Sequence, residues 1–234
     1  MATPVADARP LARRRLLTLA TLSLAALAAP GLAPRRAAAQ AGWRVGLQAG
    51  HWRADELPDE LRRLRAATGT YGGGVDEWAL NLDVARRAAA RLEAEGITVD
   101  VLPATVPPGY QADAFVAIHA DGDTSGRFSG FKLARATRSA IPEQDDRLLD
   151  AISGTYAAAT GLPLDSRVSR NMTGYYAFSS RRFTHAVAPT TPAVIIEMGF
   201  MTSPSDLPVL LNNPEALAAG ISRGVFSFLE QRGG

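Results

Sequence analysis

The stretch TPAVIIEMGF, residues 191–200, decides how the rest of the chain is interpreted. Its four consecutive apolar residues, 193–196, are typical of a strand buried on both faces, as in a parallel sheet. Glu197 follows them directly, although burying an unpaired carboxylate costs several kcal/mol or raises its pKa. The sequence therefore raises the question of which partner or task accounts for a glutamate at the end of the most apolar strand.

Outward from this strand, short apolar segments alternate with amphipathic ones. Strands are predicted at 43–50, 97–103, 113–123, 130–136, 173–180 and 192–199, and helices at 76–96, 142–161 and 213–231. This alternation favours a single-domain α/β fold, with a mostly parallel twisted sheet of about six strands and helices on both faces, as in phosphorylase/hydrolase-like folds. We expect segment 130–136 to lie beside segment 113–123, and Asp76 to cap the helix that follows it.

Residues 1–41 have the layout of an export signal. Three arginines, 13–15, precede an apolar run from Leu16 to about Ala29, and the small residues 37–39 follow. The apolar run is shorter than the ~20 residues of a spanning helix, so a membrane anchor is the alternative only if cleavage fails. Two consecutive arginines of this cluster also fit a twin-arginine export signal. We expect an exported domain at 42–234, in the periplasm or at the cell surface, without a stable membrane span.

Charge and cysteine content narrow the possible partners. The chain carries +2, but residues 1–41 carry six arginines and one aspartate, so the remaining domain carries −3. A mildly acidic domain gives no electrostatic footprint for nucleic acid. Because the chain has no cysteine, a bound metal would need His, Asp or Glu ligands.

Two of the three histidines follow apolar strands. His51 and His119 each lie at or just past a predicted strand end, as Glu197 does, whereas His185 precedes the last strand. Ligands of open α/β sheets bind outside the carboxyl ends of the strands, so we expect these three side chains at one edge. Catalytic zinc sites commonly use three protein ligands, which calls for one ligand besides the two histidines.

Glu77 is the best candidate for the third ligand. It opens the predicted helix at 76–96, where a helix N-terminus favours an ionised carboxylate. An ordinary glutamate of the first helical turn is the alternative. Glu56 and Glu60 are closer to His51 in sequence, but they belong to a charged stretch that is expected to be solvated.

Glu197 has two interpretations from the residues alone. Desolvated by its apolar neighbours, it could act as a general base that takes a proton from a metal-activated water. Alternatively, it could form a buried ion pair with Arg181 or Arg182. Together with Arg167 and Arg170, these arginines could also meet carboxylates of a substrate, although a solvated surface is the simpler interpretation.

Four segments in order resemble the zinc-dependent N-acetylmuramoyl-L-alanine amidases of the family-3 type, which trim bacterial peptidoglycan. They are VGLQAGH (45–51), EWALNLDVARRAAARLEAEGITVDVL (77–102), ADAFVAIHAD (112–121) and PAVIIEMGFMTSPSD (192–206), and the resemblance extends from about Val45 to Phe228. It implies zinc bound by His51, Glu77 and His119, with Glu197 as the catalytic carboxylate. The chain departs from the family pattern where Trp52 and Arg53 replace glycines and Asp121 replaces an asparagine.

The resemblance implies an enzyme that cleaves the amide between N-acetylmuramic acid and L-alanine, with Zn²⁺ as the only cofactor and peptidoglycan as substrate. A carboxypeptidase or acyl-amino-acid hydrolase on the same scaffold is one alternative, and a non-catalytic wall-binding protein is another. A regulatory partner is unknown. His185 or Trp52 could contact substrate, and the glycine-rich loop at 72–74 could gate access to Glu77.

Overall fold

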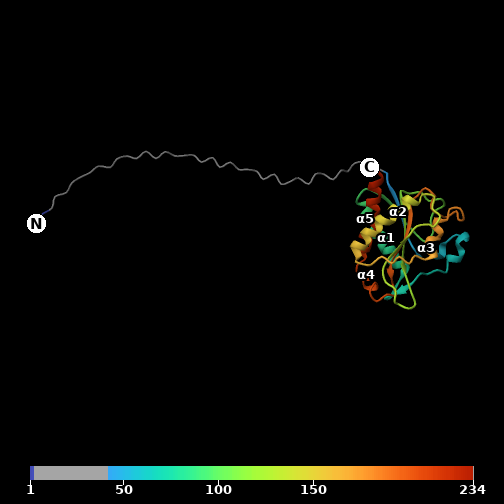
Figure 1. Ribbon diagram of the computed structural model, residues 1–234, viewed down its shortest axis with the longest axis horizontal. Coiled ribbons are helices and arrows are strands. Elements are labelled where there is room, and N and C mark those ends of the chain that lie inside the picture. The colour runs from blue at the N-terminus through green and yellow to red at the C-terminus, as the bar shows by residue number, and fades with distance from the viewer. Residues whose placement is uncertain (3–41, 234) are drawn as a thin grey trace. The chain divides into compact units, whose positions relative to one another are not determined.

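The computed structural model describes residues 1–2 and 42–233 (Figure 1). Apart from its first two residues, the predicted export signal lies outside the described residues. The strands are β1 (Arg44–Ala49), β2 (Tyr71–Gly72), β3 (Val75–Asp76), β4 (Thr98–Leu102), β5 (Ala114–Asp121), β6 (Lys132–Ala134) and β7 (Ala193–Phe200). The helices are α1 (Glu77–Glu93), α2 (Pro142–Thr160), α3 (Arg170–Thr173), α4 (Leu207–Asn212) and α5 (Pro214–Gly233), with 3₁₀ helices η1 (Ala54–Glu56), η2 (Asp59–Leu64) and η3 (Tyr176–Phe178).

The central sheet has five strands in the order β4-β1-β5-β7-β6. The first four are parallel, and β6 pairs antiparallel with β7. The α/β class and the mostly parallel sheet are therefore confirmed, with five strands rather than about six. The strand predicted at 173–180 is wrong: its middle forms η3, and the hydroxyls of Tyr175 and Tyr176 contact Gln48 on β1.

The predicted neighbour of β5 is also wrong. Segment 130–136 contributes β6, which pairs with β7 through Lys132 opposite Glu197. β7 thus lies between β5 and β6. A three-residue edge strand carries no periodicity that specifies its partner, so sequence adjacency was a poor guide.

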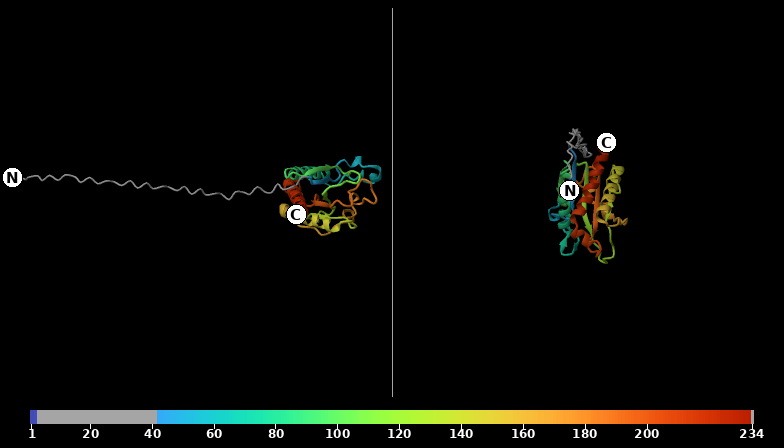
Figure 2. Two further views of the ribbon diagram at one scale, coloured as in Figure 1. Left: turned by 90° about the horizontal axis from the view of Figure 1, so that it is seen from above. Right: turned by 90° about the vertical axis from the view of Figure 1, so that its left-hand side faces the viewer.

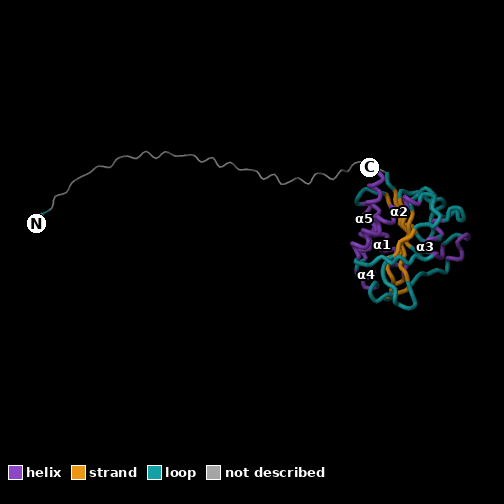
Figure 3. Tube along the Cα trace, in the orientation of Figure 1, coloured by secondary structure: helices purple, strands orange, loops and turns teal. Residues whose placement is uncertain are grey.

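The three long helices all cover one face of the sheet (Figures 1 and 3). Leu47, Ile118 and Ile196 from the strands pack in one core cluster with residues of α1, α2 and α5. Figure 2 shows the same arrangement from two further directions, and α2 and α5 lie side by side. This cluster accounts for the apolar stripe of the predicted helix at 76–96.

The opposite face is covered by short helices and loops. Phe115, Ala117 and Ile195 pack there against residues of η1, η2, α3 and η3. Helices were expected on both faces of the sheet. On this face they are present only as the short helices η1, η2, α3 and η3. Residues of β5 and β7 that share this face therefore lie beneath short helices and loops.

The glycine-rich loop forms a tight hairpin. Gly72 pairs with Val75, and the two residues between them, Gly73 and Gly74, have φ angles of 57° and 84°. Two consecutive positive φ angles characterise a type I′ turn, which suits glycine. The hairpin leads directly into α1 and so fixes where Glu77 begins the helix.

In the described part of the chain, we find no helix with the length and apolar character needed to cross a membrane.

Candidate metal centre

His51 lies just past the end of β1 in a left-handed backbone conformation, with φ of 63°. Its Nδ1 lies 2.7 Å from the carbonyl oxygen of Ala67. Because a carbonyl can only accept, Nδ1 carries the proton, and Nε2 has a free lone pair. Such a contact is the usual way in which a protein fixes the tautomer of a metal-binding histidine.

Glu77 is the first residue of α1 and is 3% exposed. Its Oε2 accepts a hydrogen bond from the amide of Thr70 at 2.8 Å, and its Oε1 accepts one from the amide of Ala120 at 3.1 Å. Burial alone would raise the pKa of Glu77, but the contacts with His119 and His51 and the backbone hydrogen bonds lower it to about 2. The carboxylate is therefore ionised at neutral pH. Asp76 occupies the N-cap position of α1, as predicted, but its side chain makes no capping hydrogen bond.

His119, on β5, is held by a second hydrogen-bond chain. Its Nε2 lies 3.2 Å from the hydroxyl of Tyr175, and that hydroxyl donates to Oε1 of Gln48 at 3.0 Å. Because the hydroxyl proton is committed to Gln48, the tyrosine oxygen accepts from Nε2–H of His119. Nδ1 of His119 faces Oε1 of Glu77 at 3.2 Å.

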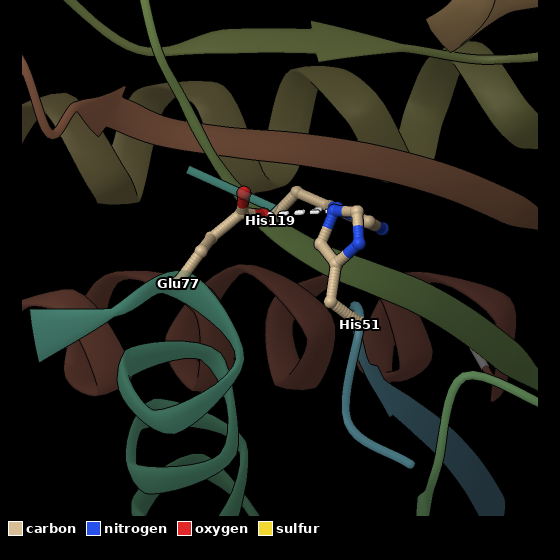
Figure 4. A group of neighbouring side chains, drawn as sticks. All are labelled: His51, Glu77 and His119. Atoms are coloured by element: carbon tan, nitrogen blue, oxygen red, sulfur yellow. Dashed lines mark hydrogen bonds and ion pairs between the residues drawn. The ribbon is translucent and has the colours of Figure 1, made fainter. Parts of the chain in front are cut away.

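One ring nitrogen of each histidine faces the carboxylate of Glu77. Nε2 of His51 lies 3.4 Å from Oε1 of Glu77, and Nδ1 of His119 lies 3.2 Å from it. Figure 4 shows the three side chains pointing toward one another, and one donor atom from each lies within 4.8 Å of the others. The group could therefore hold a metal ion.

The spacing suits a small ion with nitrogen and oxygen ligands. Ligands bound about 2.0–2.1 Å from a tetrahedral zinc lie roughly 3.3 Å from one another. The two distances from Glu77 to the histidines, 3.4 and 3.2 Å, lie on either side of this value. Two imidazoles and a carboxylate also form a donor set that zinc accepts.

Glu197 faces the same space. It is in register with His119 across the β5–β7 ladder, and in-register residues of neighbouring strands project to the same face of a sheet. Glu197 lines a pocket of about 450 Å³ together with His51, Glu77 and His119. Burial, and then the charges of Glu77 and Asp121, raise the pKa of Glu197 well above its usual value, whereas Lys132 opposes this shift.

The alternative contacts considered from the sequence fall elsewhere. Glu56 pairs with Arg53, and Glu60 lies 2.7 Å from Nδ1 of His185. Among the described residues, Glu197 forms no ion pair with Arg181 or Arg182; both arginines line a different cavity. Neither Glu56, Glu60 nor His185 lines the pocket at the histidine pair.

Three further side chains clarify what surrounds the metal group. Trp52 packs against the core beneath the guanidinium of Arg86. Tyr175 and Gln48, which orient His119, were missed from the sequence. Gln48 was visible as a polar residue inside an apolar strand, but Tyr175 lies 127 positions away from it.

The comparison with known families decides the membership. Residues 45–227 match the profile of the N-acetylmuramoyl-L-alanine amidases. The chain belongs to this amidase family. It is therefore an enzyme that hydrolyses the amide between N-acetylmuramic acid and L-alanine in peptidoglycan. A search of curated proteins finds no significant match.

Solved structures share the fold of this amidase. The amidase AmiC2 of Nostoc punctiforme is 21% identical with a TM-score of 0.55, and the match covers 80% of this chain and 97% of that one. The amidase Ami1 of Mycobacterium smegmatis is 19% identical with a TM-score of 0.61, over 81% and 98% of the two chains. Both matches cover nearly the whole of the solved chains, so the fold is shared over their full length.

The glycine before His51 is required by the packing of the amidase site. A Cβ atom at Gly50 would overlap the imidazole of His119. We expect Gly50→Ala to displace that ring and to lower metal occupancy, by at least about tenfold in affinity, while the protein remains folded. Metal titration measures the affinity, and circular dichroism shows whether the protein remains folded.

A glycine on a helix provides the matched control for this substitution. A Cβ at Gly154 on α2 meets open space, so Gly154→Ala should leave the metal affinity unchanged. Unchanged metal affinity in Gly50→Ala would show that the ring of His119 can move without disturbing the site, and would contradict the role given to this glycine.

Proposed function

We propose that this amidase binds zinc through His51, Glu77 and His119, and that Glu197 is its catalytic carboxylate. The observation that carries the proposal is the convergence of one ring nitrogen each from His51 and His119 on the carboxylate of the buried Glu77. Zinc is the metal that fits best, because the donors are nitrogen and oxygen atoms of a three-residue set and the chain has no cysteine. When bound, zinc would polarise the substrate carbonyl and make water more acidic.

Glu197 has the surroundings that a general base needs. Its carboxylate is partly buried on the rigid strand β7, in register with His119, and it shares the pocket of the three proposed ligands. In the proposed reaction, Glu197 takes the proton of the attacking water and gives it to the leaving nitrogen of L-alanine. Burial raises the pKa of this carboxylate, which makes it a stronger proton acceptor than an exposed glutamate.

The residues around the ligands have orienting tasks. The carbonyl of Ala67 fixes the His51 ring, and the Tyr175–Gln48 pair fixes the His119 ring. Two backbone amides and the side-chain amide of Asn81 hold the carboxylate of Glu77 in one position. A site whose ligands are fixed in this way binds metal with little loss of side-chain entropy.

We also propose that the domain at 42–234 acts outside the cytoplasm after removal of residues 1–41, in the periplasm or at the cell surface. Members of this family act on the cell wall, and the signal-like sequence of residues 1–41 supports export. The arginine pair in that sequence favours the twin-arginine route. A regulatory partner has a precedent in one similar structure, the CwlD amidase of Clostridioides difficile in complex with the GerS lipoprotein.

The test is mass spectrometry of muropeptides after incubation with zinc-loaded protein. We expect N-acetylmuramic acid and a peptide with a new amino-terminal L-alanine, with the addition of one water. Chelation of the zinc should abolish both products, and its re-addition should restore them. Release of single amino acids from peptides that lack a muramyl group would instead favour a carboxypeptidase or acyl-amino-acid hydrolase.

A further inference from the structure

Lys132 is a buried cation beside the metal pocket. It is the first residue of β6, it is 8% exposed, and it lies opposite Glu197 in the antiparallel β6–β7 pair. Glu197 in turn lies opposite His119 in the β5–β7 pair. Residues paired in register project to the same face of a sheet, so these three side chains form one row across three strands. Nothing in the proposed hydrolysis uses the ammonium group of Lys132.

The side chain of Lys132 crosses β7 to reach β5. Its Nζ donates a hydrogen bond to Oδ2 of Asp121 at 2.5 Å, and it lies 4.5 Å from the centre of the Phe200 ring. Asp121 ends β5, whereas Phe200 ends β7, which also carries Glu197. The ammonium group therefore passes over the strand of Glu197 and binds a carboxylate on its other side. Asp121 and Glu197 line the same pocket.

Glu197 is not a partner of this cation. In the described part of the chain, Nζ of Lys132 lies within 4.0 Å of two carboxylates, those of Asp121 at 2.5 Å and Asp165 at 3.9 Å. The charge of Lys132 nevertheless reaches Glu197, since it opposes the rise in the pKa of that carboxyl group. Lys132 is thus close to Glu197 but is bound elsewhere.

The second carboxylate near Lys132 is already paired. Asp165 accepts hydrogen bonds from the guanidinium of Arg167 through both oxygens, at 2.8 and 3.1 Å. Lysine has a flexible four-carbon stem, so its ammonium group can move to another acceptor when one is lost. If Asp121 lost its charge, Glu197 would be the carboxylate in the row that has no cationic partner of its own.

An ion pair with Lys132 would impair Glu197 as a general base. The ammonium group would donate hydrogen bonds to the oxygens that have to accept the proton of water. An adjacent positive charge also stabilises the ionised carboxylate and so makes it a weaker base. The contact between Lys132 and Asp121 prevents this pairing.

We propose that Asp121 is a positioning residue for the hydrolysis: it holds the ammonium group of Lys132 away from Glu197 and so keeps that carboxylate available as a base. The inference rests on the proposed function for the role of Glu197. It gives a task to Asp121, one of the positions at which the chain departs from the family pattern.

The test is whether one substitution suppresses the effect of another. Asp121→Asn keeps the shape of the side chain but removes its charge, and we expect kcat to fall about tenfold with zinc still bound. Adding Lys132→Met removes the ammonium group, so the double variant Asp121→Asn/Lys132→Met should return to within about threefold of the wild-type kcat. Steady-state kinetics and metal analysis of each preparation measure both quantities.

A crystal structure of the Asp121→Asn variant separates this role from a purely structural one. We expect Nζ of Lys132 to lie within hydrogen-bond distance of the carboxylate of Glu197, a contact that loss of stability alone would not create. Asp146→Asn is the matched control. Asp146 binds Arg135 at 3.0 Å and does not line the metal pocket, so this variant should keep the wild-type kcat.

The outcomes distinguish the inference from the proposed function. A double variant that stays as slow as Asp121→Asn, or a crystal structure of Asp121→Asn in which Lys132 does not approach Glu197, would overturn the inference. A wild-type kcat in Asp121→Asn, with Lys132 bound to Glu197 in its crystal structure, would instead overturn the proposed role of Glu197 as the base.

Discussion

Glu197→Gln is expected to lower the rate of amide cleavage by about 10²–10⁴-fold, the usual contribution of a general base, while zinc stays bound at the wild-type stoichiometry. The substitution keeps the size of the side chain but removes the group that accepts the proton. The shared pocket and the register of Glu197 with His119 are the reasons for this expectation. Steady-state kinetics and metal analysis of the same preparation measure both effects.

A surface glutamate serves as the control for this substitution. Glu56 pairs with Arg53 on η1, so Glu56→Gln should change neither the rate nor the zinc content. Full activity of Glu197→Gln would show that another group takes the proton. Loss of zinc in that variant would instead make Glu197 a ligand.

His119→Ala is expected to remove zinc, with an affinity loss of more than about 100-fold and a corresponding loss of cleavage. Even the residues that only orient a ligand contribute 10–100-fold to metal affinity, so a ligand itself contributes more. The Ala side chain supplies no donor atom, and Glu77 then faces His51 alone. Dialysis against a zinc buffer, followed by elemental analysis, gives the remaining affinity.

The third histidine of the chain provides the control for the ligand assignment. His185 contacts Glu60 and does not line the metal pocket, so His185→Ala should retain zinc. Stoichiometric zinc in His119→Ala would remove His119 from the ligand set. Circular dichroism of both variants separates loss of the ligand from loss of the fold.

The positions of the site residues were largely accessible from the sequence because a simple rule applies to them. His51 follows β1, whereas His119 and Glu197 lie in the carboxyl-terminal halves of β5 and β7, and parallel strands bring such positions to one edge. Whether Glu197 shares a face with His119 could not be predicted, because a shift of one residue in register reverses the face. The pairing of His119 with Glu197 between β5 and β7 answers this question.

Glu77 was the best candidate for a third ligand because it opens a predicted helix, whereas Glu56 and Glu60 lie in a charged stretch that is expected to be solvated. A glutamate in the first turn of a helix is nevertheless common, so the pattern alone left the choice open. The contact of Glu77 with the amide of Ala120 on β5 depends on how α1 packs against the sheet. The sequence pattern does not supply this packing.

The incorrect fold predictions concern contacts between segments that lie far apart in the sequence. The stretch at 173–180 has the composition of a strand, yet the contacts of Tyr175 and Tyr176 with Gln48 give it a different conformation. The same packing brings the arginines of this region around a cavity. Such a cavity cannot be read from the spacing of Arg138, Arg170 and Arg182, since the α2 helix separates the first of them from the others.

The most direct test of the account is to measure zinc content and cleavage rate on the same preparations of wild type, Glu197→Gln and His119→Ala. It asks whether His119 holds the zinc and whether Glu197 takes the proton. We predict one equivalent of zinc with full activity in the wild type, one equivalent with little activity in Glu197→Gln, and neither zinc nor activity in His119→Ala. Cleavage by wild-type protein that contains no metal, or retention of zinc by His119→Ala, would contradict it.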